Sequence, residues 1–181
     1  KVVWLRNAEK HLPPGSITGL FSLPRPIFFR TVPPMFSLEG KIAVVTGGGS
    51  GIGLAISKAF AQQGATVDIL EVNEEAGESA VKEIAEVGGT AASYACDVTL
   101  PDKVKAAFDK IISSRGRIDC LINNAGIAHV GNVLTTTEED FDRVLSVNVK
   151  GVFNCLKPGV SHMQSTGGAI VNIASTVSVM A

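Results

Sequence analysis

A glycine-rich run at residues 46–53 has the residue types and spacing best suited to chemistry in this sequence. It has the order Thr-Gly-Gly-Gly-Ser-Gly-Ile-Gly, follows an apolar stretch typical of a strand and precedes a helical pattern. Because glycine has no Cβ, a pyrophosphate can approach such a backbone closely, and the start of a helix directs unpaired N–H groups at the anion. The run predicts a dinucleotide-binding turn, with a plain glycine loop as the alternative. The turn residues expected to serve the cofactor are Gly47, Ser50, Gly51, Ile52 and Gly53.

An acid stands where the adenosine of a dinucleotide would lie. Glu71 ends the apolar run 65–70 and follows Gly47 by 24 residues. A carboxylate at this position can accept hydrogen bonds from two ribose hydroxyls, whereas it repels a 2′-phosphate. Ser50 in the glycine run and Val72 beside Glu71 are uncharged and cannot offset that repulsion. We therefore expect NAD as the cofactor rather than NADP; a solvated acid at a strand end is the alternative.

A third segment, the Asn-Asn-Ala-Gly run at 123–126, follows the strand-like run 118–122. Together, the pattern TGxxxGxG, the acid and NNAG resemble the short-chain dehydrogenase/reductase family of the classical type, from about Leu38 to Ala181. The resemblance implies an oxidoreductase that transfers hydride between NAD and a small-molecule substrate, a secondary alcohol or ketone. We expect the parent protein to be a homo-oligomer. The further cofactor positions are Asp97, Val98, Asn124, Ala125 and Gly126.

Asn148 and Ser175 are the catalytic candidates. Asn148 lies four residues after Val144 and four before Val152, on an apolar stripe. An unpaired buried amide there would cost about 1–3 kcal/mol, so Asn148 must have a partner. By resemblance it matches the asparagine of the family's Asn-Ser-Tyr-Lys tetrad, and Ser175 matches the serine that hydrogen-bonds the substrate oxygen. A core asparagine that only bends its helix is the alternative.

The family's Tyr-x-x-x-Lys motif would begin about thirteen residues beyond Ser175, past Ala181. We therefore expect a portion of a longer dehydrogenase, truncated before that motif and without turnover by itself. A non-catalytic nucleotide-binding or interaction protein is the alternative function. A serine hydrolase is disfavoured, because the run 48–52 lacks the second glycine of a Gly-x-Ser-x-Gly elbow.

Strand and helix patterns alternate from Ile42 onward. Each pair of strands is separated by enough residues for a helix, so the strands should pair in parallel with helices on both faces. The expected fold is α/β, a doubly wound parallel sheet of Rossmann type. It is expected to be incomplete at its C-terminal edge, because the family continues the sheet beyond the fifth strand, 169–174. Helix caps are expected at Asn73 and Thr137. The apolar stripes expected to face the core are Ile52, Ala55, Ile56, Ala59 and Phe60; Ala76, Ala80, Ile84 and Val87; Val104, Ala107, Phe108 and Ile111; and Phe141, Val144, Leu145 and Val152.

Composition bounds the remaining possibilities. The chain of 181 residues is 45% hydrophobic and 18% charged, which is typical of a globular domain. Residues 38–181 form the expected NAD(P)-binding domain, and their excess of acids argues against nucleic-acid binding. Residues 1–37 form a Pro-rich, basic leader, expected to be disordered or to act in targeting.

The three cysteines and three histidines have no ligand-like spacing, so we expect free thiols and no metal site. Free thiols indicate a reducing compartment. No apolar run approaches the roughly 20 residues of a membrane helix, so no membrane partner is expected. The expected location is the cytoplasm, or an organelle matrix if the leader is a transit peptide.

Overall fold

The computed structural model describes residues 36–175. The leader predicted at 1–37 therefore lies almost entirely outside the described residues. Among the described helices, none combines the length and the apolar character needed to cross a bilayer.

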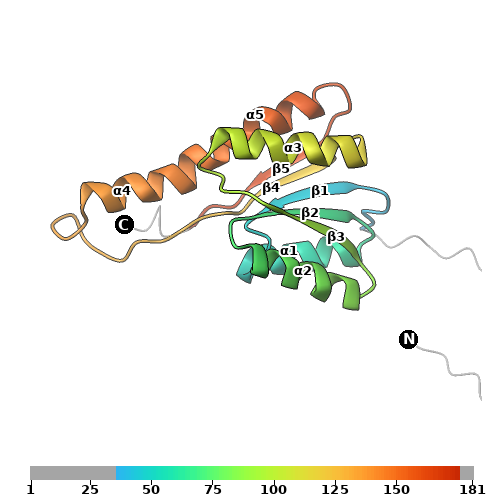
Figure 1. Cartoon of the computed structure of the whole chain (residues 1–181), viewed down its shortest axis with the longest axis horizontal. Helices are drawn as coiled ribbons and strands as arrows, with labels where there is room; N and C mark the ends of the chain where they lie inside the picture. The colour runs from blue at the N-terminus through green and yellow to red at the C-terminus, as the bar shows by residue number, and fades with distance from the viewer. Residues whose placement is uncertain (1–35, 176–181) are drawn as a thin grey trace, which may run out of the picture. The chain divides into compact units, whose positions relative to one another are not determined.

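The centre of the fold is one sheet of five parallel strands in the order β3-β2-β1-β4-β5 (Figure 1). The chain moves outward from β1 to β3 and then returns to the other side of β1, so the crevice between β1 and β4 is a topological switch point. The predicted doubly wound parallel sheet is confirmed. The strands are β1 (Ile42–Thr46), β2 (Thr66–Glu71), β3 (Thr90–Ala95), β4 (Cys120–Asn123) and β5 (Ala169–Asn172).

Helices cover both faces of this sheet. Figure 1 shows α1 (Gly51–Gln62) and α2 (Glu74–Glu86) on one face, and α3 (Pro101–Arg115) and α5 (Val152–Met163) on the other. Successive residues of β1 point to opposite faces, as a pleated strand requires: Val44 joins the core under α3 and α5, whereas Val45 joins the core over α1 and α2. Strands that are buried on both faces explain the continuous apolar runs of the sequence.

Two helices match their predicted patterns closely. In α3 the expected stripe of Val104, Ala107, Phe108 and Ile111 is fully buried. In α2 the expected cap is present, because the Asn73 side chain accepts a hydrogen bond from the Ala76 N–H at 3.1 Å. Ala80 and Ile84 are buried as expected, whereas Val87 lies just past the helix end and is exposed; Gly77 is buried instead.

The predicted stripe of α1 is confirmed only in part. Ile56 and Phe60 are half-buried and pack against the core as predicted, whereas Ile52 is 66% exposed. The buried residues of the helix are Gly53, Ser57 and Ala61. Small residues are required there because the helix lies against the turn that follows β1: a Cβ on Gly53 would lie 2.0 Å from the Gly47 carbonyl oxygen. The Ser57 hydroxyl is satisfied within the helix, donating to the Gly53 carbonyl at 2.9 Å.

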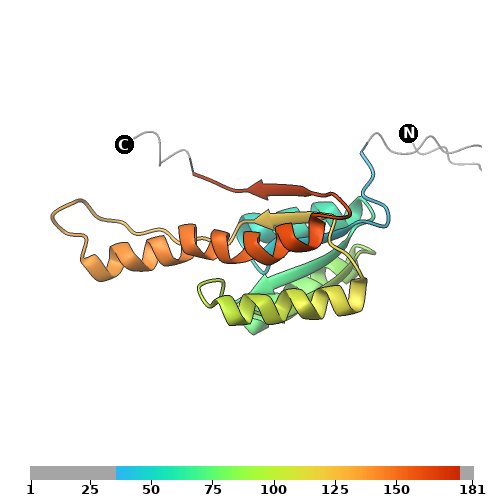
Figure 2. The same cartoon turned by 90° about the horizontal axis from the view of Figure 1, so that it is seen from above.

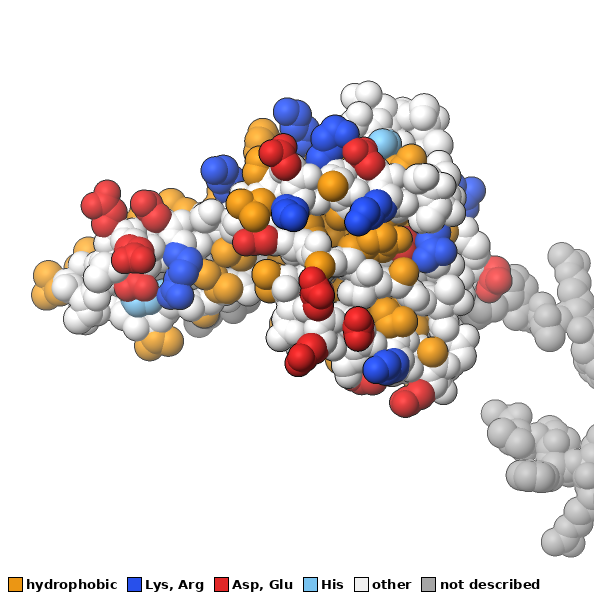
Figure 3. All heavy atoms as spheres, viewed as in Figure 1, with side chains coloured by type: hydrophobic (Ala, Val, Ile, Leu, Met, Phe, Trp, Pro, Cys, Tyr) orange, Lys and Arg blue, Asp and Glu red, His pale blue; other side chains and the backbone are white. Residues whose placement is uncertain are grey.

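The segment after β4 leads to α4 (Glu138–Leu145), a π-helical stretch η1 (Ser146–Gly151), and α5. Thr137 caps α4 as predicted, accepting a hydrogen bond from the Asp140 N–H at 3.1 Å. The predicted burial of Phe141 and Leu145 is wrong, because α4 has no buried residue and extends past the sheet (Figures 1 and 2). Figure 3 shows acidic side chains gathered over this helix.

The fifth strand is shorter than the predicted 169–174 and forms an outer strand of the described sheet. Val171 on β5 and Ile173 just beyond it are exposed, so an incomplete edge is present among the described residues. The cysteines form no disulfide, as expected: Cys96 and Cys155 are buried and Cys120 is half-buried.

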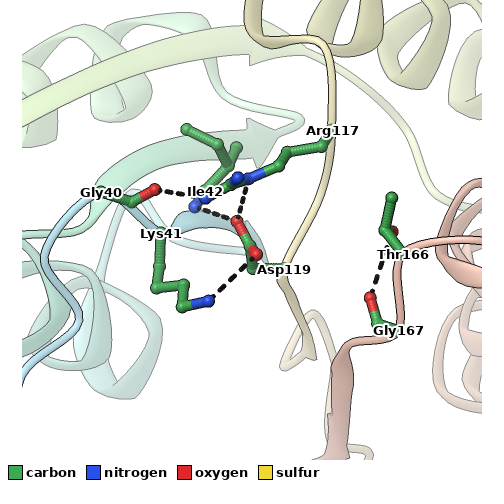
Figure 4. Close-up of polar contacts among 7 residues, drawn as sticks. All are labelled: Gly40, Lys41, Ile42, Arg117, Asp119, Thr166 and Gly167. Atoms are coloured by element: carbon green, nitrogen blue, oxygen red, sulfur yellow. Dashed lines mark hydrogen bonds and ion pairs between the residues drawn. The ribbon is translucent and has the colours of Figure 1, made fainter.

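At the amino ends of β1 and β4, one carboxylate joins several partners (Figure 4). Asp119 accepts hydrogen bonds from the Ile42 N–H at 2.9 Å and from Arg117 Nε at 2.9 Å, and Lys41 Nζ lies 3.4 Å away. Arg117 Nη2 also donates to the Gly40 carbonyl at 2.8 Å. This cluster ties the start of β1 to the start of β4.

Candidate cofactor-binding site

A cleft of about 680 Å³ opens at the carboxyl ends of β1, β2, β3 and β4. This volume is within the range of small-molecule and cofactor sites. Ten of the eleven cofactor positions predicted from the sequence line it, although they come from four separate segments. They are Gly47, Ser50, Gly51, Ile52, Glu71, Asp97, Val98, Asn124, Ala125 and Gly126.

The glycine turn forms the wall of the cleft at the start of α1. Gly47 and Gly51 have positive φ angles of 64° and 51°, a conformation that favours glycine. A Cβ on Gly47 would lie 2.9 Å from the Ala125 Cα. Gly53, the eleventh position, lies beneath the cleft, where it allows α1 to approach the turn. Ser50 is the N-cap of α1 but its side chain makes no capping hydrogen bond. The helix start therefore keeps donors available for an anion in the cleft.

Thr46 and Asn124 hold the two central turns together. The Thr46 hydroxyl oxygen accepts hydrogen bonds from the backbone N–H groups of Asn124 and Ala125, both at 3.0 Å. In return, Asn124 Nδ2 donates to the carbonyls of Thr46 and Gly47, both at 3.1 Å. The amide of Asn124 is thus committed to the glycine turn, and it fixes the floor of the cleft between β1 and β4.

Glu71 is the last residue of β2, at the carboxyl end of the strand beside β1, and is only 9% exposed. Its Oε2 accepts a hydrogen bond from the Gly49 N–H at 3.1 Å, and its Oε1 accepts from the N–H groups of Val72 at 3.0 Å and Asn73 at 3.2 Å. These three bonds hold a carboxylate at the cleft between the glycine turn and the start of α2. An ionised carboxylate has about four lone-pair sites, so acceptor capacity remains for a ligand hydroxyl.

The β3–α3 loop forms the next part of the wall. Asp97 Oδ1 accepts hydrogen bonds from the Thr99 N–H at 2.9 Å and from its hydroxyl at 2.7 Å, a turn that shapes the loop. The Val98 carbonyl accepts a hydrogen bond from Asn154 Nδ2 at 2.9 Å, which ties this loop to α5. Burial raises the pKa of the neighbouring Cys96 to about 11. The Cys96 thiol is therefore protonated at neutral pH and is a poor nucleophile.

The two catalytic candidates do not line the cleft. Asn148 lies in η1 and is exposed, so its predicted burial is wrong: the end of the helix that carries it reaches past the sheet. Its predicted need for a partner is met by Ile127, whose N–H donates to Asn148 Oδ1 at 2.9 Å and whose carbonyl accepts from Nδ2 at 2.9 Å. Ser175 lies beyond the end of β5 and is exposed. Their catalytic roles stay predictions.

Several cleft residues were not predicted from the sequence. Ile127 directly follows the Asn-Asn-Ala-Gly run, and Thr99 follows the Asp97 turn, so extending each motif would have found them. Arg143, Ser146 and Val147 come from α4 and η1 at spacings of three and four, which share one helix face, but no motif marks them. The unpredicted lining residues are Leu70, Val72, Cys96, Thr99, Ile127, Arg143, Ser146 and Val147.

Within residues 36–175, no group of three or more His, Cys, Asp or Glu side chains could hold a metal ion. The lining of the cleft combines main-chain donors at a helix start with a carboxylate, the two features that bind a pyrophosphate and a ribose in dinucleotide sites.

Residues 41–181 match the family model described as short chain dehydrogenase. The chain belongs to this family of oxidoreductases. Among short-chain dehydrogenases, it is 42% identical over 143 residues to the 3-oxoacyl-(acyl-carrier-protein) reductase FabG of Thermotoga maritima, covering 78% of this chain and 58% of that protein. It is 38% identical over 147 residues to the D-threitol dehydrogenase of Mycolicibacterium smegmatis, covering 81% of this chain and 56% of that protein. The chain thus spans little more than half the length of these curated relatives.

Solved short-chain dehydrogenase structures share the fold. The structure of NAD+-bound xylitol dehydrogenase has a TM-score of 0.76 and 39% identity, over 79% of this chain and 56% of that chain. A 7α-hydroxysteroid dehydrogenase complexed with NADH and 7-oxo glycochenodeoxycholic acid has a TM-score of 0.76 and 34% identity, over 80% of this chain and 57% of that chain. The family and its Rossmann-type fold, both expected from the glycine, acid and NNAG motifs, are confirmed.

Proposed function

We propose that the cleft binds NAD and that the chain serves hydride transfer between NAD and a secondary alcohol or ketone. One observation carries the proposal: a glycine turn with an uncapped helix start and a nearly buried carboxylate line the same cleft. The first suits a pyrophosphate and the second suits the hydroxyls of a ribose. No plain glycine loop would bring these two groups together.

Different groups of cleft residues would contact different parts of the cofactor. The pyrophosphate would lie over the turn of Gly47 and Gly51, where main-chain donors and the helix dipole stabilise negative charge. The adenosine ribose would lie at Glu71, and the adenine beside Asp97 and Val98. The remaining proposed contacts are Ser50, Ile52, Asn124, Ala125 and Gly126, with Gly53 supporting the turn from beneath.

When bound, NAD supplies the carbon that accepts or donates hydride. The chain's own residues bind and orient the two reactants. Asn148 fixes Ile127, which lines the cleft, through its two hydrogen bonds. Ser175 has the hydroxyl that we assign to the substrate oxygen, where it would orient a carbonyl or alcohol for transfer.

Charge supports NAD over NADP. A 2′-phosphate on the adenosine ribose would lie against the Glu71 carboxylate, and the neighbouring Val72 offers no positive charge to offset the repulsion. Of the described residues that line the cleft, Arg143 alone is basic, and its Nη2 lies 3.3 Å from Asp140 Oδ1. The titles of the xylitol and hydroxysteroid dehydrogenase structures name NAD+ and NADH, which is consistent with this preference.

A nucleotide-binding protein without catalysis is the second candidate. The cleft itself favours it, because the residues that line it suit a cofactor, while Asn148 and Ser175 lie outside the lining. Because this chain is expected to have no turnover by itself, the two candidates differ in hydride transfer from NADH to simple ketones by the protein at the full length of its relatives. Turnover of that protein that is lost in Ser175→Ala would favour the dehydrogenase, whereas NAD binding without any turnover would favour the second candidate.

The cofactor proposal is tested by calorimetric titration of the chain with NAD and with NADP. We expect NAD to bind more tightly, and Glu71→Arg to narrow or invert the difference, because carboxylate repulsion becomes attraction for the phosphate. Glu75→Arg adds the same charge on the exposed first turn of α2 and serves as the control. Equal affinities of the wild-type chain for the two cofactors would contradict the proposal.

A further inference from the structure

Glu71 makes contacts that ribose binding does not require. We infer that Glu71 is also a positioning residue, whose carboxylate fixes the glycine turn against the start of α2 before any cofactor arrives. This inference rests on the proposed function for its consequence, namely that the pyrophosphate and adenosine ends of the site are coupled through one side chain. The contacts themselves lie entirely within the chain.

The carboxylate bridges two segments that are far apart in the sequence. One oxygen, Oε2, accepts from Gly49 in the turn after β1, at 3.1 Å. The other, Oε1, accepts from Val72 and Asn73 in the turn after β2, at 3.0 and 3.2 Å. Because each oxygen serves a different turn, the side chain holds the two turns at a fixed separation.

Gly49 shows how closely the bridge is packed. The residue is buried, and a Cβ on it would lie 2.9 Å from both Cγ and Oε2 of Glu71 and 3.1 Å from the carbonyl carbon of Ala76 in α2. A buried main-chain N–H almost always has an acceptor, and for Gly49 that acceptor is Glu71. Any side chain at position 49 would collide with the Glu71 carboxylate, so the bridge requires glycine at this position.

The bridge depends on both the length and the chemistry of glutamate. Aspartate keeps the charge but is one methylene shorter, so it cannot reach both turns from the same strand position. Glutamine keeps the length but has one acceptor oxygen, and its amide nitrogen can only donate, so one side of the bridge is lost. The two variants therefore separate the positioning role from the charge.

This arrangement also strengthens the proposed discrimination against NADP. A free carboxylate could rotate away from a 2′-phosphate, but Glu71 can do so only by giving up hydrogen bonds to buried or half-buried main-chain groups. A turn that is already fixed also spares the entropy of ordering it when the cofactor binds. Selectivity and affinity thus depend on the same three bonds.

The test measures amide exchange at Gly49 by NMR in the cofactor-free chain, for the wild type, Glu71→Asp and Glu71→Gln. Glu75→Gln is the matched control, because it removes an acid from the exposed first turn of α2. We expect a protected Gly49 amide in the wild type and the control, and exchange about tenfold faster or more in Glu71→Asp. Glu71→Gln keeps one acceptor oxygen, so it should lose protection either at Gly49 or at Val72 and Asn73, but not at both turns. Glu71→Asp should also weaken the binding of inorganic pyrophosphate, which has no ribose.

Unchanged Gly49 exchange in Glu71→Asp would overturn the inference, as would weaker NAD binding with pyrophosphate binding intact, because Glu71 would then contact only the ribose. If the variants do not fold, the wild type still decides, since a Gly49 amide that exchanges as fast as those of the exposed loop before α4 excludes the bridge. Absence of NAD binding to a wild-type chain with a protected Gly49 would instead count against the proposed function alone.

Discussion

The two ends of the parallel strands use polar residues in opposite ways. At the amino ends, Asp119 is surrounded by the Ile42 N–H, Arg117 and Lys41, all from the two strand starts. At the carboxyl ends, the glycine turn and Glu71 border a cleft of about 680 Å³. Both ends contain a partly or nearly buried carboxylate that accepts main-chain hydrogen bonds.

The two ends differ in whether their polar groups keep hydrogen-bonding capacity or charge that the fold does not use. The Asp119 cluster pairs one acid with two bases, so the negative charge of the carboxylate is compensated within the fold. At the carboxyl ends, Glu71 forms no ion pair with another residue of the range 36–175, and it lies beside a helix start that has no side-chain cap. Polar groups that satisfy each other contribute stability, whereas groups that keep unused donors or acceptors at a cavity indicate a ligand.

The largest expected effect is that of Gly53→Ala at the carboxyl end. Its Cβ would lie 2.0 Å from the Gly47 carbonyl oxygen and 2.5 Å from Asn124 Nδ2, so α1 must move away from the turn. We expect a loss of about 3 kcal/mol in the free energy of unfolding, together with the loss of NAD binding. Urea unfolding and calorimetry measure the two effects.

Gly40→Ala at the amino end is the control for this change. Gly40 also has a positive φ, 68°, but a Cβ there has no heavy atom within 4 Å. Gly40→Ala should therefore lower the free energy of unfolding only by the backbone strain, about 1–2 kcal/mol, and should leave the affinity for NAD unchanged. If Gly53→Ala and Gly40→Ala lost NAD binding equally, the claim that only the carboxyl ends of the strands bind the cofactor would be wrong.

Asp119→Ala should affect stability without affecting the cleft. It leaves the half-buried Ile42 N–H without its acceptor and removes the partner of Arg117 and Lys41, at a cost of about 2 kcal/mol. Asp109→Ala removes only an exposed pair with Lys105 and should cost a few tenths of a kcal/mol, roughly 0.3–0.5. Weaker NAD binding in Asp119→Ala at unchanged stability would contradict this account.

A smaller effect is expected from pH. Burial alone would raise the pKa of Asp119, but the Ile42 hydrogen bond and the charges of Arg117 and Lys41 outweigh it and hold the pKa below its ordinary value. A lowered pKa in the folded state contributes stability above about pH 4, and this stability is lost as the pH falls through the folded pKa. Urea midpoints between pH 6 and pH 3 should fall more steeply for the wild type than for Asp119→Asn. Parallel curves would show that Asp119 is not responsible.

The sequence predicts the strands and the helices that pack by ordinary apolar stripes. In α3 the spacing of Val104, Ala107, Phe108 and Ile111 identifies the buried face, because large apolar side chains do the packing. In α1 the same rule holds only in part. Ile56 and Phe60 pack against the core as predicted, but the buried positions hold small residues, and the large Ile52 lines the cleft instead.

The features that could not be predicted depend on the structure around a helix, and the residue pattern of the helix itself contains no information about those surroundings. The apolar residues of α4 predict a buried face, but Phe141 is 56% exposed because the helix extends past the sheet. Asn148 needed a partner, and only the folded chain identifies it as Ile127. The turns of the cleft were predictable because each carries a recognisable sequence motif. Arg143 also lines the cleft, but no motif in the sequence marks it.

The most direct test of the central claim is a map of backbone amide shifts on titration of the chain with NAD. The account predicts perturbations at the carboxyl end, at Gly47, Gly51, Val98 and Ala125, with the amides of Ile42 and Asp119 at the amino end unchanged. Shifts confined to the amino end, or no shifts at saturating NAD, would contradict it.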